Sequence, residues 1–283
     1  MTLAALYDVP APAKLNLFLH VVGRRPDGYH LLQSVFVLID WCDTLHLERR
    51  SDGRLQRHDL GQALPADDLV LRAARLLQQA SGCTDGADLH IDKVLPAQAG
   101  MGGGSSDAAT TLLGLNRLWG LNWSRQRLAA LGLQLGADVP FFVHGRNAWV
   151  EGIGEQIRPI DLPPAQFEVV KPHAGVETAQ IFRSPDLNRS TKPAILSVFA
   201  ADPYGFGHND LQPVAQALCP EIQAALSWLE SQGLQARMTG SGSAVFAHCP
   251  EGTPPLQAPN HWTHRRCSIL EVHPLWEWAS SDD

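Results

Sequence analysis

The glycine-rich stretch at residues 100–106, Gly-Met-Gly-Gly-Gly-Ser-Ser, limits what this chain can fold into more than any other segment. Its glycines allow positive φ angles and a very close approach of the backbone to a ligand. Residues 87–95 before it alternate apolar and polar side chains, as a strand does, and Pro96 ends that pattern. Apolar residues within 108–119 then recur with helical spacing. The sequence therefore predicts a strand, a glycine loop and a helix whose N-terminus suits an anion such as phosphate.

This loop departs from two standard phosphate-binding patterns. No lysine follows the glycines, as it does in the ATPase loop, and Ser105 stands where the dinucleotide fingerprint requires its third glycine. A flexible Gly/Ser linker is the alternative, but linkers are not usually flanked by a strand and an amphipathic helix. Ser105, Ser106 and Asp107 are side chains favoured where a helix begins. We interpret the segment as a phosphate loop that takes its cation from elsewhere in the fold.

Composition narrows the class of protein. Of the 283 residues, 45% are hydrophobic and 18% charged, which is typical of a soluble globular enzyme. A net charge of −7 argues against a nucleic-acid-binding surface. Five cysteines without a Cys-x-x-Cys pair indicate a reducing compartment. Because there is no signal sequence and no apolar run near the ~20 residues that span a membrane, we expect a cytoplasmic protein.

Lys14 and Asp138 are the side chains that could complete phosphate chemistry around the loop, which requires charge neutralisation and a group that orients the attacking hydroxyl. Lys14 and Asn16 lie on the polar face of the alternating segment 11–22, and Leu19 is expected on its other face. That polar face could border a cleft or simply be solvated. Asp138 could equally cap the short helix expected after it. Spacing alone leaves both pairs of alternatives open.

Periodicity predicts strands and helices on both sides of a proline-rich junction. The junction, Leu162-Pro163-Pro164, is the expected boundary between domains 1–162 and 163–283. Strands are expected at 11–22, 35–39, 43–48, 87–95, 167–171, 235–238, 244–247 and 268–272, with a hairpin at 146–160. Helices are expected at 69–80, 108–119, 124–135, 176–182, 195–200, 213–218 and 221–232.

Five motifs occur in order over roughly residues 12–247. They are Pro-Ala-Lys-Leu-Asn-Leu (12–17), Asp-Gly-Tyr-His-x-Leu-x-Ser (27–34), Ala-Gly-Met-Gly-Gly-Gly-Ser-Ser-Asp-Ala-Ala (99–109), Gly-Ala-Asp-Val-Pro-Phe-Phe (136–142) and Thr-Gly-Ser-Gly-Ser-Ala-Val-Phe (239–246). Together they resemble the GHMP kinases, the superfamily of galactose, homoserine, mevalonate and phosphomevalonate kinases. The glycine loop alone indicates the superfamily.

The resemblance implies an α+β fold of two lobes, an N-terminal ribosomal-protein-like β/α lobe and a C-terminal ferredoxin-like lobe, with the active site between them. It implies that Asp138 is a catalytic aspartate that takes or orients the hydroxyl proton. It also implies that Lys14 is a catalytic lysine that keeps Asp138 ionised. Matching ATP-binding positions are Pro96, Ala97, Gln98, Ala99, Gly100, Met101, Gly102, Gly103, Gly104, Ser105 and Ser106. Matching substrate-binding positions are Asn16, Tyr29, His30 and Phe182.

Two shorter segments, Asp-Gly-Tyr-His at 27–30 and Asn-Asp-Leu at 209–211, resemble a narrower group within the superfamily. That group uses ATP to phosphorylate the 2-hydroxyl of a cytidine diphosphate-linked methylerythritol in the non-mevalonate isoprenoid pathway. Phe182 would then lie against the cytosine ring. The alternatives are a homoserine-type or mevalonate-type kinase, or a non-catalytic nucleotide or sugar sensor on the same fold.

Metal and partner expectations also follow from this resemblance. Mg²⁺ is expected to accompany ATP, with Ser105 or Ser106 as candidate ligands and no dedicated metal site. His261, His264 and Cys267 have metal-like spacing but no fourth ligand, so the two histidines are expected to be surface residues. We expect small-molecule substrates, no nucleic-acid or membrane partner, and a monomer or homodimer.

Overall fold

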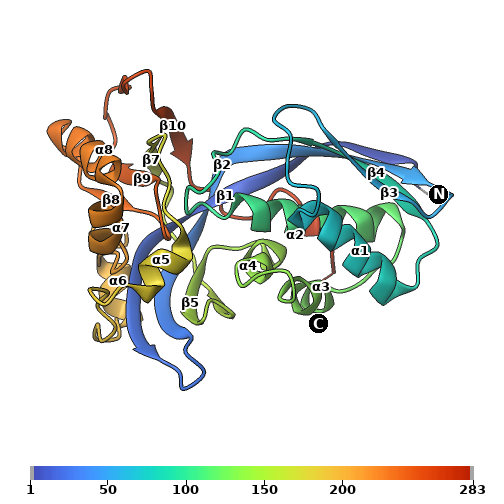
Figure 1. Ribbon diagram of the computed structural model, residues 1–283, viewed down its shortest axis with the longest axis horizontal. Coiled ribbons are helices and arrows are strands. Elements are labelled where there is room, and N and C mark those ends of the chain that lie inside the picture. The colour runs from blue at the N-terminus through green and yellow to red at the C-terminus, as the bar shows by residue number, and fades with distance from the viewer. Residues whose placement is uncertain (1–2, 281–283) are drawn as a thin grey trace.

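Two long antiparallel strands, β1 (Ala5–Arg24) and β2 (His30–Arg50), run through both halves of the molecule (Figure 1). The computed structural model describes residues 3–280. The register of β1 against β2 shifts between Asn16 and Leu19, which makes a β-bulge. The bulge reverses the alternation of side chains, so Leu19 faces the same cavity as Lys14 and Asn16. The expectation that Leu19 lies on the opposite face was therefore wrong.

The first lobe is a mixed sheet covered by helices. Strands run in the order β3-β4-β2-β5-β6, and β1 pairs with β2. Figure 1 shows helices α1 to α4 along one side of this sheet, and they enclose the larger part of the hydrophobic core. The elements are β3 (Leu55–Asp59), α1 (Leu69–Ser81), β4 (Gly86–Asp92), α2 (Gly103–Leu118), α3 (Arg125–Gly132), α4 (Val139–His144), β5 (Ala148–Gly152) and β6 (Gln156–Pro159).

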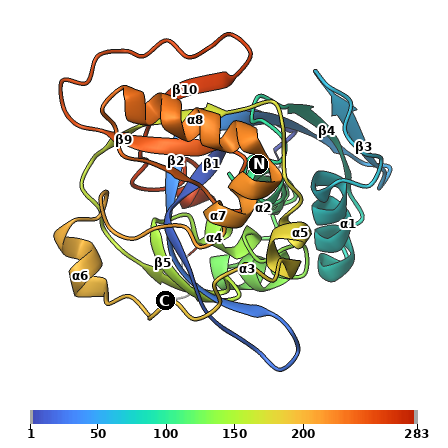
Figure 2. The same ribbon diagram turned by 60° about the vertical axis from the view of Figure 1, so that its left-hand side comes forward.

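The second lobe is a four-stranded antiparallel sheet in the order β10-β7-β9-β8. Helix α8 packs on strands β8 and β9 through Ile222, Leu226 and Leu229, and α7 lies beside it (Figure 2). The elements are β7 (Gln166–Lys171), α5 (Thr178–Arg183), α6 (Leu196–Ala201), α7 (Gln212–Leu218), α8 (Pro220–Ser231), β8 (Ala236–Met238), β9 (Val245–Cys249) and β10 (Thr263–Ser268). The expected two-lobe α+β fold is confirmed.

The last described residues return to the first lobe. After β10 the chain makes only isolated bridges, from Ile269 to Ile39 and from Val272 to Arg146, so the strand expected at 268–272 was wrong. Leu275 is buried in the first lobe's core, and a short helix η1 (Trp276–Trp278) contacts α2. The boundary between domains 1–162 and 163–283 stays a prediction, and part of the second segment packs against the first.

Other helix ends differ from the expected ones. Helix α2 begins at Gly103 after Gly102, which has φ +70°, so Ser105, Ser106 and Asp107 lie in its first turns and do not cap it. Helix α3 is capped by Ser124 as expected but ends at Gly132, short of residue 135. Within residues 3–280, no helix is long and apolar enough to cross a membrane.

Candidate active site

The glycine loop is packed against the second glycine turn, residues 239–243, so closely that side chains cannot fit. Gly100 has φ +71°, and a Cβ there would overlap the carbonyl oxygen of Thr239 and lie 2.8 Å from the nitrogen of Gly242. Two main-chain hydrogen bonds join the turns, from Ser243 N to Gln98 O (3.0 Å) and from Ala244 N to Ala99 O (3.2 Å). A loop from the first lobe is thus fixed directly to a turn of the second.

The two serines of the loop face different surroundings. Ser106 is fully buried, and its hydroxyl donates to the Pro12 carbonyl at 2.6 Å. Ser105 is half-buried, with its Oγ 3.8 Å from the Cβ position of Gly136, on the Asp138 side of the loop. Only the Ser105 hydroxyl therefore faces space that a ligand could occupy.

Lys93 is a cation beside the loop that sequence reasoning overlooked. Its ammonium contacts Asp107 Oδ2 at 2.6 Å and also Asp43. Burial, opposed by Lys93, raises the pKa of Asp107 to about 7, whereas the two carboxylates raise the pKa of Lys93 against the effect of its own burial. In the sequence Lys93 is a single lysine at the end of a strand-like segment, just before Pro96. Its spacing gives no indication that its side chain pairs with two carboxylates elsewhere in the chain.

Two cavities meet at the glycine loop. The larger, of about 1080 Å³, is lined by every residue from Pro96 to Ser105, together with residues around Leu69 and α5. The smaller, of about 210 Å³, is lined by Lys14, Asp138 and Phe182 among others. Gly100, Gly102, Thr178 and Ser241 line both. The arrangement can place a long phosphate-bearing ligand on one side of the loop and a second molecule on the other.

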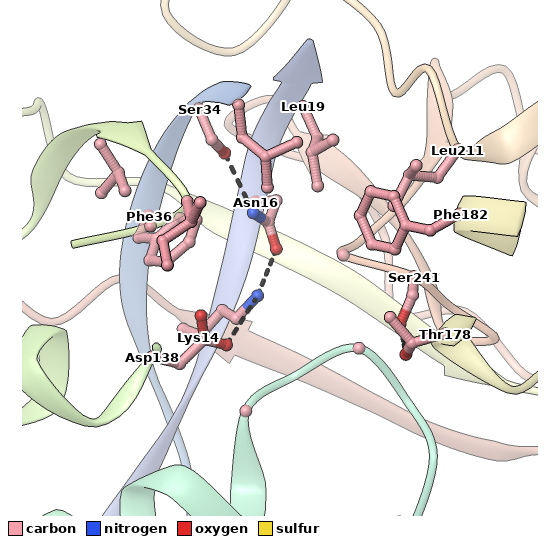
Figure 3. Close-up of a pocket in the computed structure, with 17 residues that line it drawn as sticks. Lys14, Asn16, Leu19, Ser34, Phe36, Asp138, Thr178, Phe182, Leu211 and Ser241 are labelled. Atoms are coloured by element: carbon pink, nitrogen blue, oxygen red, sulfur yellow. Dashed lines mark hydrogen bonds and ion pairs between the residues drawn. The ribbon is translucent and has the colours of Figure 1, made fainter. Parts of the chain in front are cut away.

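Lys14 and Asp138 meet in the smaller cavity (Figure 3), where the Lys14 side chain lies against Gly102 of the glycine loop. Lys14 Nζ lies 3.7 Å from Asp138 Oδ2 and 4.6 Å from the centre of the Phe36 ring, and it donates to Asn16 Oδ1. Burial lowers the pKa of Lys14, and the Asp138 charge opposes that shift. Lys14 is 3% exposed and Asn16 1%, which excludes a solvated outer face. Asp138 precedes α4 without a capping hydrogen bond, so the helix-cap alternative was wrong as well.

The four residues matched to a substrate site fall into two groups. Asn16 and Phe182 line the smaller cavity, whereas Tyr29 and His30 are not among its lining residues. His30 packs on Phe182, with ring centres 4.9 Å apart and planes inclined by 30°, and Tyr29 is 60% exposed. Phe182 lies across the cavity from Lys14 (Figure 3), and His30 packs on it from outside the lining.

Arg189 holds this aromatic group together and was also missed. Its Nε donates to His30 Nε2 at 3.1 Å, and its Nη2 donates to the carbonyls of Phe182 (3.1 Å) and Ser184 (2.6 Å). Burial and the charge of Arg189 lower the pKa of His30. Arg189 lies in a polar loop without periodicity, so the sequence contains no signal for these contacts.

Side chains of the segment that contains His261, His264 and Cys267 make other contacts. His264 pairs with Glu168 at 2.5 Å, Arg266 contacts the same carboxylate, and Cys267 is buried. Among residues 3–280 there is no group of three or more His, Cys, Asp or Glu side chains that could hold a metal ion.

Comparison with known proteins agrees with this geometry. Residues 68–146 match the family described as GHMP kinases N terminal domain, and residues 197–267 match GHMP kinases C terminal. A mevalonate kinase from Methanococcus jannaschii has the same fold at 13% identity, with a TM-score of 0.64 over 95% of this chain and 99% of that one. The two family matches and the shared two-lobe fold define a GHMP kinase.

Full-length relatives narrow the assignment. The 4-diphosphocytidyl-2-C-methyl-D-erythritol kinase of Variovorax paradoxus (strain S110) is 62% identical, over 98% of this chain and 99% of its own length. That of Methylibium petroleiphilum is 63% identical, over 99% and 100%. A crystal structure of 4-(cytidine 5'-diphospho)-2C-methyl-D-erythritol kinase matches with 32% identity and a TM-score of 0.77, over 92% of this chain and 98% of that one. The chain belongs to the 4-diphosphocytidyl-2-C-methyl-D-erythritol kinase family of the GHMP kinases.

Proposed function

We propose that this protein transfers the γ-phosphate of ATP to the 2-hydroxyl of 4-(cytidine 5'-diphospho)-2-C-methyl-D-erythritol, giving the 2-phosphate and ADP. The observation that carries the proposal is the pairing of buried Lys14 with partly exposed Asp138 in the smaller of two cavities that share a glycine loop. The names of its full-length relatives support the choice of acceptor. The step belongs to the non-mevalonate isoprenoid pathway.

In this proposal ATP occupies the larger cavity. The loop from Pro96 to Ser105 offers main-chain N–H groups and the positive end of α2 to the phosphates, and the left-handed Gly102 starts that helix. Ser106 supports the loop from behind through its bond to Pro12. Because the loop has no lysine of its own, Lys14 supplies positive charge at the end where the γ-phosphate would lie.

The acceptor occupies the smaller cavity with its hydroxyl against Asp138. Asp138 Oδ accepts the hydroxyl proton as the new oxygen–phosphorus bond forms and the bond to the β-phosphate oxygen of ADP breaks. Lys14, whose Nζ lies 3.7 Å from Asp138 Oδ2, stabilises the charge that develops on the transferred group. No phosphoenzyme is required, because acceptor and donor meet directly at this pair.

The outer aromatic group is the proposed site of the cytosine ring. Phe182 and His30, with Tyr29 beside them, provide flat surfaces of the kind that hold a pyrimidine by stacking. Asn16 reaches the same cavity from β1, nearer to the reacting atoms. A small alcohol such as homoserine or mevalonate would leave this end empty.

Mg²⁺ is proposed as the companion of ATP. Magnesium in kinases is bound largely by phosphate oxygens and water with few protein ligands, so the absence of a carboxylate cage among the described residues is compatible with it. Ser105 Oγ is the candidate protein ligand, because the Ser106 hydroxyl is committed to Pro12. When bound, the ion would neutralise phosphate charge. The five free cysteines fit a reducing compartment such as the cytoplasm, and the enzyme would act as a monomer or homodimer.

ADP release measured with a panel of acceptors tests the proposal. We expect turnover with the cytidine diphosphate-linked methylerythritol and none with homoserine or mevalonate. Asp138→Ala, Asp138→Asn and Lys14→Ala should each lower kcat by about 10² or more. Asp161→Asn, at an exposed carboxylate paired with Arg146, is the matched control and should leave kcat unchanged. Equal turnover of homoserine, or full activity of Asp138→Asn, would contradict the proposal, and binding without turnover would favour a sensor.

A further inference from the structure

Ser34 is a buried hydroxyl beside the Lys14–Asp138 pair to which neither the motifs nor the comparisons give a role. It lies on β2, is 2% exposed and lines the smaller cavity. Figure 3 shows Ser34, Asn16, Lys14 and Asp138 joined in one chain of polar contacts. We propose that Ser34 is a positioning residue for phosphoryl transfer, which orients the Asn16 amide so that its oxygen, and not its nitrogen, faces the Lys14 ammonium. This inference rests on the proposed function.

The bulge in β1 explains why the Ser34 hydroxyl directs its hydrogen towards Phe18 O and not towards Asn16. Between Asn16 and Leu19 the ladder to β2 is interrupted, so the carbonyls of Leu17 and Phe18 accept from side chains. Arg237 Nη1 donates to Leu17 O at 2.6 Å, and Ser34 Oγ donates to Phe18 O at 2.5 Å. A serine hydroxyl has a single hydrogen, and here it is committed to the bulge.

The remaining lone pairs of Ser34 can only accept. Asn16 Nδ2 lies 3.0 Å from Ser34 Oγ, so this end of the amide must be the NH2 group. The other end, Oδ1, then faces Lys14 Nζ and accepts its hydrogen. The backbone of Asn16 cannot turn to compensate, because its N–H donates to Thr239 Oγ1 at 2.9 Å. The order of donors and acceptors is therefore set from the bulge to the ammonium.

Removing the hydroxyl takes away the contact that fixes the NH2 end of the Asn16 amide. The orientation of the amide then rests on Lys14 Nζ and on Thr239 Oγ1, which lies 3.5 Å from Oδ1, and a turned amide would present its N–H hydrogens to a cation. With the amide turned, Asp138 would be the one acceptor left to the Lys14 ammonium among the contacts of residues 3–280. The Phe36 ring lies 4.6 Å from the same ammonium. Lys14 would move from the line between the two substrates, and displacements of about 1 Å at such a site are costly.

The test compares Ser34→Ala with Ser34→Thr, which keeps the hydroxyl. Ser34→Ala should lower kcat about 10-fold, equivalent to about 1.4 kcal/mol, without changing KM for ATP. Ser34→Thr should restore kcat. Thr111→Val is the matched control, because Thr111 also donates a buried hydroxyl hydrogen to a carbonyl, of Asp107 at 2.7 Å, but lies within α2. It should lower the unfolding temperature and leave kcat unchanged.

A double-mutant cycle separates a positioning role from a merely structural one. If Ser34 acts through Asn16, adding Ser34→Ala to Asn16→Ala should not lower kcat further. The basic limb of the kcat–pH profile should also move to lower pH in Ser34→Ala, since the Lys14 cation loses an acceptor while Asp138 and Phe36 remain. Additive losses, an unshifted profile, or failure of Ser34→Thr to rescue would overturn the inference. If the unaltered enzyme does not turn over the substrate, the proposed function itself is wrong.

Discussion

The contact between the two glycine turns gives a sharp test through Gly100→Ala, with Gly120→Ala as its matched control. Both glycines are left-handed, with φ of +71° and +67°. A Cβ at Gly120 meets nothing within 4 Å, whereas at Gly100 it overlaps the Thr239 carbonyl. An alanine in this conformation lowers the free energy of unfolding by about 1–2 kcal/mol in either place. Any further decrease in the free energy of unfolding at Gly100 therefore measures the contact between the turns.

The additional loss at Gly100 can be worked from the structure. The second turn must withdraw by about 1 Å to relieve the overlap, which strains the two main-chain bonds from Ser243 and Ala244 at about 0.5–1.5 kcal/mol each. We therefore expect about 1–2 kcal/mol lost for Gly120→Ala and about 2–5 kcal/mol for Gly100→Ala. At about 2–4 °C per kcal/mol, scanning calorimetry resolves the two. kcat/KM for ATP should fall about 10²-fold in Gly100→Ala alone. Equal unfolding temperatures and equal kinetics for the two variants would refute the reasoning.

Three further predictions concern the residues around the site. Arg189→Met should raise KM for the acceptor about 10-fold, by freeing His30 and Phe182, whereas Arg183→Met on the exposed side of α5 should not, as initial rates will show. Arg125→Met should lower the free energy of unfolding, measured with urea, by about 3 kcal/mol, because the guanidinium donates hydrogen bonds to the carbonyls of Val143, Trp276 and Ala279. Burial lowers the pKa of His273 to about 3, so below its ordinary value of 6.5 the unfolded chain binds a proton that the folded chain does not. Stability should then fall by about 1.4 kcal/mol per pH unit as the pH drops towards 4, and urea titrations of His273→Asn should lack this component.

The parts of the site that sequence reasoning could predict are local ones. The strand, loop and helix around 100–106 follow from periodicity and glycine content, and Ser124 caps α3 as its position indicates. Lys14 and Asp138 were candidates from the residues themselves, but their roles came from the resemblance, because spacing alone left each with a structural alternative. The fold excludes both alternatives by burial and by the absence of a capping bond at Asp138.

What the sequence could not give depends on contacts between distant segments. Arg189 meets His30 across 159 positions, and Lys93 meets Asp43 across 50. The β1 bulge moves Leu19 into the cavity, although the uninterrupted alternation of 11–22 contains no mark of it. The segment 268–272 has a strand-like composition but no continuous partner, since Ile269 and Val272 bridge to different elements. Propensity describes a residue and its neighbours, whereas pairing decides whether a strand forms.

The position of Lys14 relative to the phosphate loop is fixed by the backbone as well as by its side chain. Its own N–H donates to the carbonyl of Met101 at 3.0 Å, in the middle of the loop. Two residues on, the N–H of Asn16 donates to Thr239 Oγ1, and Thr239 lies against Gly100. Strand, loop and second turn are thus one hydrogen-bonded unit, which fixes the distance between the glycine loop and the proposed catalytic cation, Lys14. Preorganisation of this kind removes reorganisation from the chemical step.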